Sequence, residues 1–211
     1  MRIIITLIAC LLFTSLVAYG ADTKQSEKRY QSLVEKIKTN GTAKDFSELR
    51  QIFVNTKRYN PYNSKEETLR APMAKAMGAK KWKKCISLAE KALDYNYLYI
   101  RGHLNAAYCY SKLENKNKEK FHANILKSLI KAIADTGDGK SPESAFKTIS
   151  VNEVQSFLLL SGYIVKQQAL IQDELGRFDL MTVTDRQTNE ELGLYFDVNV
   201  QMGQFLKNLP K

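Results

Sequence analysis

Apolar residues recur at helical spacing through the first two thirds of the chain. Two amphipathic helices are predicted near its beginning, from Tyr30, Leu33, Val34 and Ile37 and from Phe46, Leu49, Ile52 and Phe53. Asn40-Gly41 marks the end of the first helix. Pro61 disfavours helical backbone at Asn60, so the pattern predicts a turn at residues 59–62. Ser64 and Glu67 have the spacing of a capping box, and Pro72 is expected to kink or divide the helix that follows.

Three further helices are predicted from Trp82 onward, the last of them ending at Gly137 and Gly139, where we expect positive φ. The stretch WKKCISLAEKALDYNYLYIRGHLNAAYCYSKL resembles the second helix of one tetratricopeptide repeat running into the first helix of the next. Trp82, the Ala92-Leu93 pair, Ala107 and Tyr110 occupy the aromatic and small positions of that repeat. Tyr97 stands where the repeat usually has proline, and only one clear helix pair is present. The resemblance implies a tetratricopeptide-like array that is not regular.

After residue 140 the pattern changes character. AFKTI, residues 145–149, is predicted as a short strand, and Ser150 to Glu153 as a capping box that opens a helix ending at Gly162. Alternation with a period of two then predicts three antiparallel strands, carried by Val165, Ala169 and Ile171, by Phe178, Leu180 and Thr182, and by Leu192, Leu194, Phe196, Val198 and Val200. QMGQFLKNL is predicted to close the chain as a short helix.

The predicted fold class is therefore α+β, with an N-terminal tetratricopeptide-like helical array followed by a small antiparallel β-meander with packed helices. We divide the chain into a signal peptide at residues 1–20, a helical part at 21–140 and an α+β module at 141–211.

The N-terminus has the pattern of an export signal. Arg2 precedes an apolar run over residues 3–17, and Ala18-Tyr19-Gly20 offers small residues for cleavage before Ala21. Leu7 to Cys10 resembles a lipoprotein box, but the apolar run continues past Cys10. We expect an extracytoplasmic protein, periplasmic or secreted, with no membrane span in the mature chain. Cys85 and Cys109 remain after cleavage, and they form either a disulfide or two buried thiols.

Charge is distributed unevenly. Residues 21–140 carry 25 Lys and Arg against 13 Asp and Glu, a balance of +12, whereas residues 141–211 carry 6 against 9, a balance of −3. The densest basic cluster is Lys80, Lys81, Lys83 and Lys84 around Trp82. This cluster is either a partner-binding patch or a solvated helix start with one core tryptophan.

ADTGDGKSPESAF, residues 134–146, matches a relaxed nucleotide-binding P-loop. A P-loop leaves a strand and enters a helix, but here a predicted helix precedes the motif and Pro142 follows Ser141. Asp135 and Asp138 are not part of the alternating series of acids that a calcium-binding loop requires. No Cys, Asp or Glu stands at metal-binding spacing from His103 or His122 on the same helix face. We therefore expect no cofactor and no metal, and we interpret the stretch as a domain boundary.

Several blocks together resemble a known family. LRQIF and RYNPYN, the helix pair from Trp82, GDGKSPESAFKTISVNE, and FDLMTV with LYFDVNV are similar to the secreted bacterial family catalogued as domain of unknown function 4919. The chain departs from its pattern at Val154-Gln155, where an acid and an aromatic residue are expected. The resemblance implies export and architecture and supplies no catalytic residue.

Three functions fit these observations. The first is an extracytoplasmic interaction or scaffold module, whose basic helical half binds a protein or an anionic envelope component and no nucleic acid. The second is an envelope enzyme using acids near the junction, namely Asp135, Asp138, Glu143 and Glu153. The third is a binder of an anionic polymer or lipid. The lopsided charge and the helical pattern favour the first.

Overall fold

The computed structural model describes the backbone of residues 23–207 and the side chains of residues 23–203. The predicted signal peptide, its cleavage site after Gly20 and the alternative lipid site at Cys10 lie outside the described residues.

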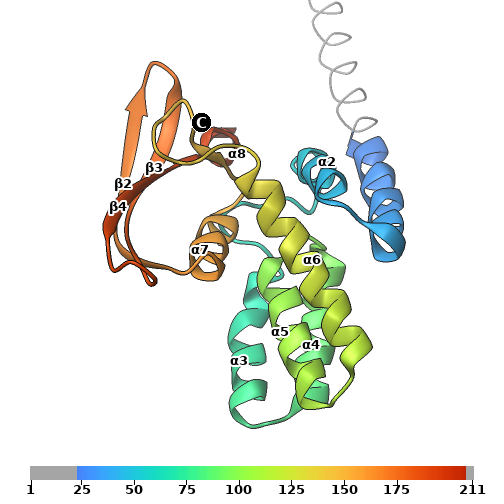
Figure 1. The fold of residues 1–211 in the computed structure, drawn as a ribbon. Coiled ribbons are helices and arrows are strands. Elements are labelled where there is room, and N and C mark those ends of the chain that lie inside the picture. The colour runs from blue at the N-terminus through green and yellow to red at the C-terminus, as the bar shows by residue number, and fades with distance from the viewer. Residues whose placement is uncertain (1–22, 208–211) are drawn as a thin grey trace, which may run out of the picture.

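Helices build the first part of the molecule (Figure 1). Residues 23–40 are helical and are called helix 23–40 below. The elements that follow are α2 (Ala43–Phe53), the 3-10 helix η1 (Glu67–Leu69), α3 (Arg70–Gly78), α4 (Trp82–Tyr95), α5 (Ile100–Lys112) and α6 (Lys116–Ala134). From α3 to α6 each helix packs on the next, and α2 packs on α6.

A four-stranded sheet builds the second part. Its elements are β1 (Phe146–Lys147), α7 (Val151–Leu160), β2 (Tyr163–Asp173), β3 (Gly176–Asp185), β4 (Glu191–Asp197) and α8 (Asn199–Lys207). The strand order is β1-β4-β3-β2, and the sheet curves around α7 (Figure 1). The fold class is α+β, as predicted; the tetratricopeptide-like character of the helices stays a prediction.

One core connects the two parts. Buried side chains run without interruption from Tyr30 and Phe46 through Leu129 to Phe157 of α7 and Phe196 of β4. Because the same cluster contains helix and sheet residues, the helices and the sheet stabilise each other.

A buried ion pair crosses the same junction. Arg50 of α2 and Glu153 of α7 are 5% and 4% exposed, and their side chains form two hydrogen bonds of 2.9 Å, from Nε to Oε1 and from Nη2 to Oε2. Arg50 also donates to the carbonyl oxygens of Ala132 and Lys147, and the Ile149 amide donates to Glu153 at 2.9 Å. Every charged atom of the pair therefore has a partner in spite of its burial.

Of the two local predictions before α4, the capping box is wrong and the divided helix is confirmed. Ser64 and Glu67 form no capping box, since η1 begins without a side-chain cap. The Glu67 carboxylate instead accepts hydrogen bonds from the Tyr99 hydroxyl and the Asn152 amide, both at 2.8 Å. Pro72 lies in the first turn of α3, directly after η1, so the helical stretch that follows Ser64 is divided near the proline into a 3-10 segment and an α segment.

The sheet also differs from its prediction. The strand expected at 145–149 is only Phe146–Lys147, and it pairs in parallel with β4, so the sheet is mixed. β2, β3 and β4 form the expected antiparallel meander. β4 ends at Asp197, whose carboxylate accepts the Asn199 amide at the start of α8, so Val198 and Val200 lie outside the strand.

β3 was predicted in the wrong phase. Met181 and Val183 are the side chains that join the core, whereas Leu180 and Thr182 on the alternate face are only partly buried. Phe178 on that second face is also buried, which explains why the alternation was misleading.

Candidate functional site

A hollow lies between helix 23–40, α4 and α6, and we call it the helical groove. Its volume is about 590 Å³, within the range of ligand sites in proteins. Helix 23–40 contributes five side chains to its lining, and α6 and the end of α4 contribute most of the others. The lining residues are Tyr30, Gln31, Val34, Glu35, Lys38, Arg58, Glu90, Leu93, Asp94, Tyr97, Lys118, Phe121 and His122. A smaller hollow of about 200 Å³ continues the groove along helix 23–40 and α6, and Lys38 and Phe121 line both hollows.

Tyr97 is the unusual member of this lining. Its side chain is buried, and its hydroxyl group has no hydrogen-bond partner. Its backbone amide, in contrast, donates to the Tyr30 hydroxyl at 2.8 Å. Burial raises the pKa of Tyr97, so the hydroxyl keeps its proton and remains a donor. Leaving such a group unsatisfied costs about 1–3 kcal/mol. The oxygen itself is enclosed, so a ligand acceptor would recover this free energy only when a neighbouring side chain of the lining moves aside.

A histidine pair lies beneath the groove. His103 Nε2 is 2.8 Å from the Tyr97 carbonyl oxygen, so this nitrogen carries a proton and donates. His103 Nδ1 must then accept, and His122 Nδ1, 3.0 Å away, donates to it. Burial lowers the pKa of both imidazoles, so the pair is neutral near pH 7. The tautomers leave His122 Nε2 as an acceptor in a side chain that lines the groove.

Charges of both signs surround the groove. Lys38 pairs with Glu35 at 2.7 Å, and the Lys118 ammonium lies over the Phe121 ring at 5.7 Å. Arg58 pairs with Glu27 at 3.1 Å and donates to a backbone carbonyl of α4. The groove thus combines aromatic rings, one unsatisfied donor, one acceptor and mixed charge, which suits noncovalent binding and supplies no nucleophile with a base.

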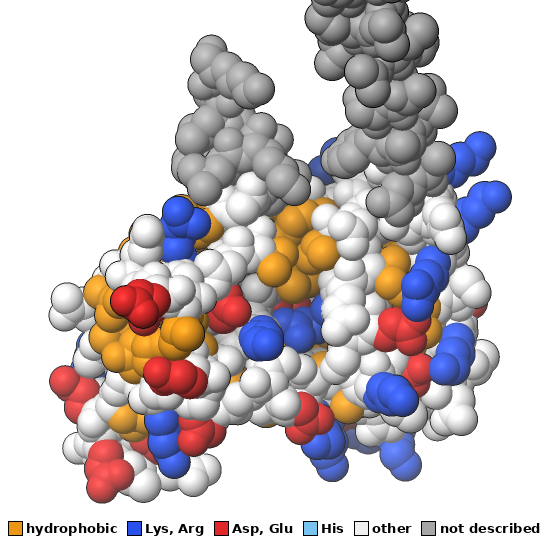
Figure 2. Space-filling view, turned by 90° about the horizontal axis from the view of Figure 1, so that it is seen from above, with side chains coloured by type: hydrophobic (Ala, Val, Ile, Leu, Met, Phe, Trp, Pro, Cys, Tyr) orange, Lys and Arg blue, Asp and Glu red, His pale blue; other side chains and the backbone are white. Residues whose placement is uncertain are grey.

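The four candidate lysines lie elsewhere, at the turn between α3 and α4. Lys81 precedes α4, Lys83 and Lys84 are in its first turn, and Lys80 has a positive φ of 53°. Lys81 and Lys84 border a separate shallow hollow of about 420 Å³ beside Pro72. None of the four lines the helical groove. In Figure 2 Lys and Arg gather mainly over the helical side, and Asp and Glu lie more densely over the sheet.

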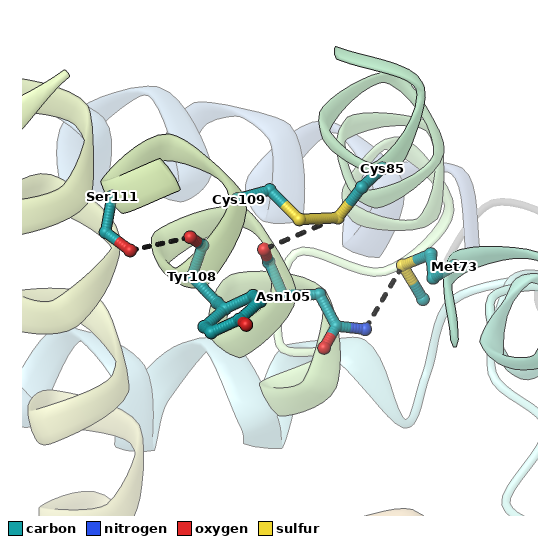
Figure 3. The surroundings of a disulfide bond; sticks show 6 residues. All are labelled: Met73, Cys85, Asn105, Tyr108, Cys109 and Ser111. Carbon is teal, nitrogen blue, oxygen red and sulfur yellow. Dashed lines mark hydrogen bonds between the residues drawn. A yellow bond between two sulfur atoms is a disulfide. The ribbon is translucent and has the colours of Figure 1, made fainter. Parts of the chain in front are cut away.

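Cys85 and Cys109 are joined in a disulfide that links α4 to α5, with Cα atoms 6.4 Å apart (Figure 3). Cys85 Sγ lies 3.7 Å from the Asn105 carbonyl oxygen, and the Asn105 amide donates to Met73 Sδ at 3.5 Å. Both cysteines are fully buried, so the bond joins the helices from inside.

The four candidate acids do not form a catalytic pair. Glu153 is held by Arg50, and Asp135 pairs with Lys131 on the surface at 2.6 Å. Asp138 accepts the Ser144 hydroxyl at 2.6 Å, and this bond lowers the pKa of its carboxyl group. Glu143 is exposed, and a hydrogen bond from Ser141 lowers its pKa.

The P-loop-like stretch has no free phosphate cradle. The Gly139 amide donates to Ser144 O and the Gly139 carbonyl accepts from Tyr195, both at 2.8 Å, so this backbone is engaged within the protein. Gly139 has the predicted positive φ, 71°, but Gly137 does not. Gly137 is instead required by close approach, since a Cβ there would lie 2.1 Å from the Ser144 carbonyl oxygen. The loop packs between α6 and the sheet. It follows a helix, whereas a P-loop follows a strand.

The sequence predicts that the helical half presents a groove to a partner, but it identifies none of the residues that line the helical groove as site residues. The sequence analysis excludes a metal site at His103 and His122 and assigns them no other role, and it identifies Tyr97 only as a departure from the repeat proline. That departure was the available signal, because a buried tyrosine in a turn brings a hydroxyl group that needs a partner.

Within residues 23–207 no helix is both long and apolar enough to cross a membrane. The same residues contain no group of three or more His, Cys, Asp or Glu that could hold a metal ion. The family model described as Domain of unknown function (DUF4919) matches residues 19–207. No curated protein and no solved structure matches the chain.

Proposed function

The chain belongs to the DUF4919 family, and we propose from the geometry of the helical groove that it is an extracytoplasmic module that binds a segment of a partner protein. The unsatisfied Tyr97 hydroxyl carries this proposal. A folded protein tolerates such a group at a loss of stability, and a ligand with a carbonyl or carboxylate oxygen would satisfy it.

The shape of the groove favours an extended polypeptide. The main hollow and its continuation run along helix 23–40 and α6, with Lys38 and Phe121 common to both. A peptide offers what this lining can use: backbone oxygens for Tyr97, an N–H for His122 Nε2, and side chains for the aromatic rings.

Two observations support an extracytoplasmic location. The N-terminal sequence has the pattern of an export signal, and the Cys85–Cys109 disulfide is of a kind that persists in oxidising compartments.

Charge adds to the association rate. The balance of +12 over residues 21–140 creates a field that attracts an anionic partner, and the lysines at 80, 81, 83 and 84 are its densest source. They act at a distance from the groove, by steering and not by contact.

The test begins with photo-crosslinking in the host envelope. A benzophenone amino acid at Gln31, an exposed position in the groove lining, is compared with one at exposed Gln172 in β2. We expect a dominant protein adduct at Gln31 alone. Equal yields at the two positions would refute the groove as the binding site.

The identified partner is then purified and its affinity measured for the wild type and for Tyr97→Phe. We expect binding at least about tenfold weaker, equivalent to about 1.4 kcal/mol, because one hydrogen bond is lost. Tyr97→Phe should leave the unbound protein as stable or more stable, since an unsatisfied buried hydroxyl is removed. Tyr108→Phe, on a largely exposed tyrosine outside the groove, is the matched control. Unchanged affinity of Tyr97→Phe would contradict the proposal.

Steering is measured separately by stopped-flow association. Replacing Lys80, Lys81, Lys83 and Lys84 with Gln should slow association at about 0.01 M salt and have little effect at about 0.15 M, where the Debye length is about 8 Å. Equal association rates of both proteins at low salt would show that this cluster plays no part.

A further inference from the structure

A further hollow lies between α7 and the concave face of the sheet, and we call it the α7–sheet groove. Its volume is about 440 Å³. Val151, Gln155 and Leu159 form one stripe of α7 along it, at spacings of four residues, and Val165 and Met181 face them from β2 and β3. The walls are mainly apolar and remain partly uncovered, since Leu159 and Val165 are 39% and 46% exposed.

Two arginines line this groove without ion pairs. Arg101, in the first turn of α5, has an Nε atom that is fully enclosed and has no hydrogen-bond partner. Neither Arg101 nor Arg186 forms an ion pair with a described residue; of the other described arginines, Arg29, Arg50, Arg58 and Arg70 do and Arg177 does not. An enclosed guanidinium nitrogen without an acceptor is unfavourable, and the Arg101 head group has no counter-charge among the described residues.

The surroundings of Arg101 do not supply that counter-charge. The nearby Glu67 carboxylate is already engaged by Tyr99, Asn152 and Arg70. Asp179 also lines the groove, and burial raises the pKa of its carboxyl group, but it forms no ion pair with either arginine of the lining among the described residues. Arg101 also lies at the positive end of the α5 dipole, so an anion there would be favoured twice.

We propose that the α7–sheet groove binds a small amphipathic anion, a carboxylate with an aliphatic chain. Arg101 holds the carboxylate through paired N–H donors, Arg186 adds positive charge at the exposed side, and the chain lies between α7 and β2. The volume fits a free small molecule, and apolar walls with a few polar anchors are the usual composition of such sites. This site is separate from the helical groove and does not depend on the function proposed for it.

The proposal is tested by calorimetric titration of the mature protein with dodecanoate below its aggregation concentration. Dodecylammonium has the same chain with the opposite charge, and acetate has the charge without the chain. We expect saturable one-site binding of dodecanoate only. Equal binding of dodecylammonium, or binding to anionic phospholipid vesicles without binding to free dodecanoate, would overturn the proposal.

Variants locate the site. Arg101→Gln should weaken dodecanoate binding at least about tenfold, and Arg101→Lys should bind with intermediate affinity because it keeps the charge but loses the planar pair of donors. Gln155→Trp fills the groove from an exposed helix position and should abolish binding without removing any charge. Lys166→Gln is the matched control, since Lys166 is exposed on β2 outside the lining. Thermal unfolding of each variant is recorded first, and full affinity in folded Arg101→Gln or Gln155→Trp would place the ligand elsewhere.

Discussion

Replacing Glu153 by glutamine tests whether this acid is structural. The change leaves the Arg50 guanidinium in a buried site, 5% exposed, without the carboxylate that accepts two of its N–H groups at 2.9 Å. The glutamine amide can accept one of these bonds, but its NH₂ group then faces a donor, either Arg50 or the Ile149 amide.

The expected loss is large because one charge is left buried and unpaired. Breaking such a pair from one side typically costs about 3–5 kcal/mol, a substantial part of the about 5–15 kcal/mol that stabilises a folded domain. The free energy of unfolding is measured by urea titration followed by circular dichroism. Glu143→Gln, in an exposed carboxylate of the same junction, should change it by less than about 0.5 kcal/mol.

A double variant separates charge from shape. Arg50→Met with Glu153→Leu removes both charges and should recover most of the stability, since apolar replacement of a whole buried pair is often neutral. The reasoning fails if Glu153→Gln loses less than about 1 kcal/mol, or if the double variant is as unstable as the single one.

Three further outcomes are expected. Because burial lowers the pKa of His103 and His122, an unfolded chain takes up their protons below about pH 6.5 while the folded one does not. The free energy of unfolding should therefore decrease as the pH is lowered below about 6.5, by up to about 1.4 kcal/mol per pH unit for each histidine. Equal urea midpoints at pH 7 and pH 5 would contradict this. Reduction of the Cys85–Cys109 bond should add two hydrogens to the intact mass and lower the free energy of unfolding by about 3 kcal/mol, whereas a mass unaffected by reductant would exclude the bond. Calorimetric titration with ATP and magnesium should give no saturable heat, and a micromolar site abolished by Lys140→Ala would reverse our interpretation of that loop.

Local patterns predicted most of the elements. The amphipathic spacing around Phe46 and around Leu129 gave helices that are present, and alternation gave the three antiparallel strands. Ser150 does cap α7, with its hydroxyl accepting the Glu153 amide. These features depend on residues close in sequence, which is the range over which periodicity and capping act.

Contacts between distant residues could not be predicted in this way. The strand at Phe146 is defined by its pairing with β4, and the Glu153 carboxylate turns toward Arg50 instead of closing its capping box on Ser150. The helical groove follows from how helix 23–40 packs against α4 and α6, and no spacing along the chain encodes that arrangement. β3 buries side chains on both faces, Phe178 on one and Met181 and Val183 on the other, so alternation alone predicts the wrong phase.

The strand order makes β4, near the end of the chain, necessary for the pairing of β1, which comes much earlier. β4 lies between β1 and β3, so Phe196 pairs with Phe146 on one side and with Asp179 on the other. A chain that leaves the ribosome N-terminus first presents β1 well before its partner strand exists. A stop codon before residue 191 therefore leaves β1 unpaired and opens one edge of β3, and its product is a substrate for proteases, not a shorter version of the helical half.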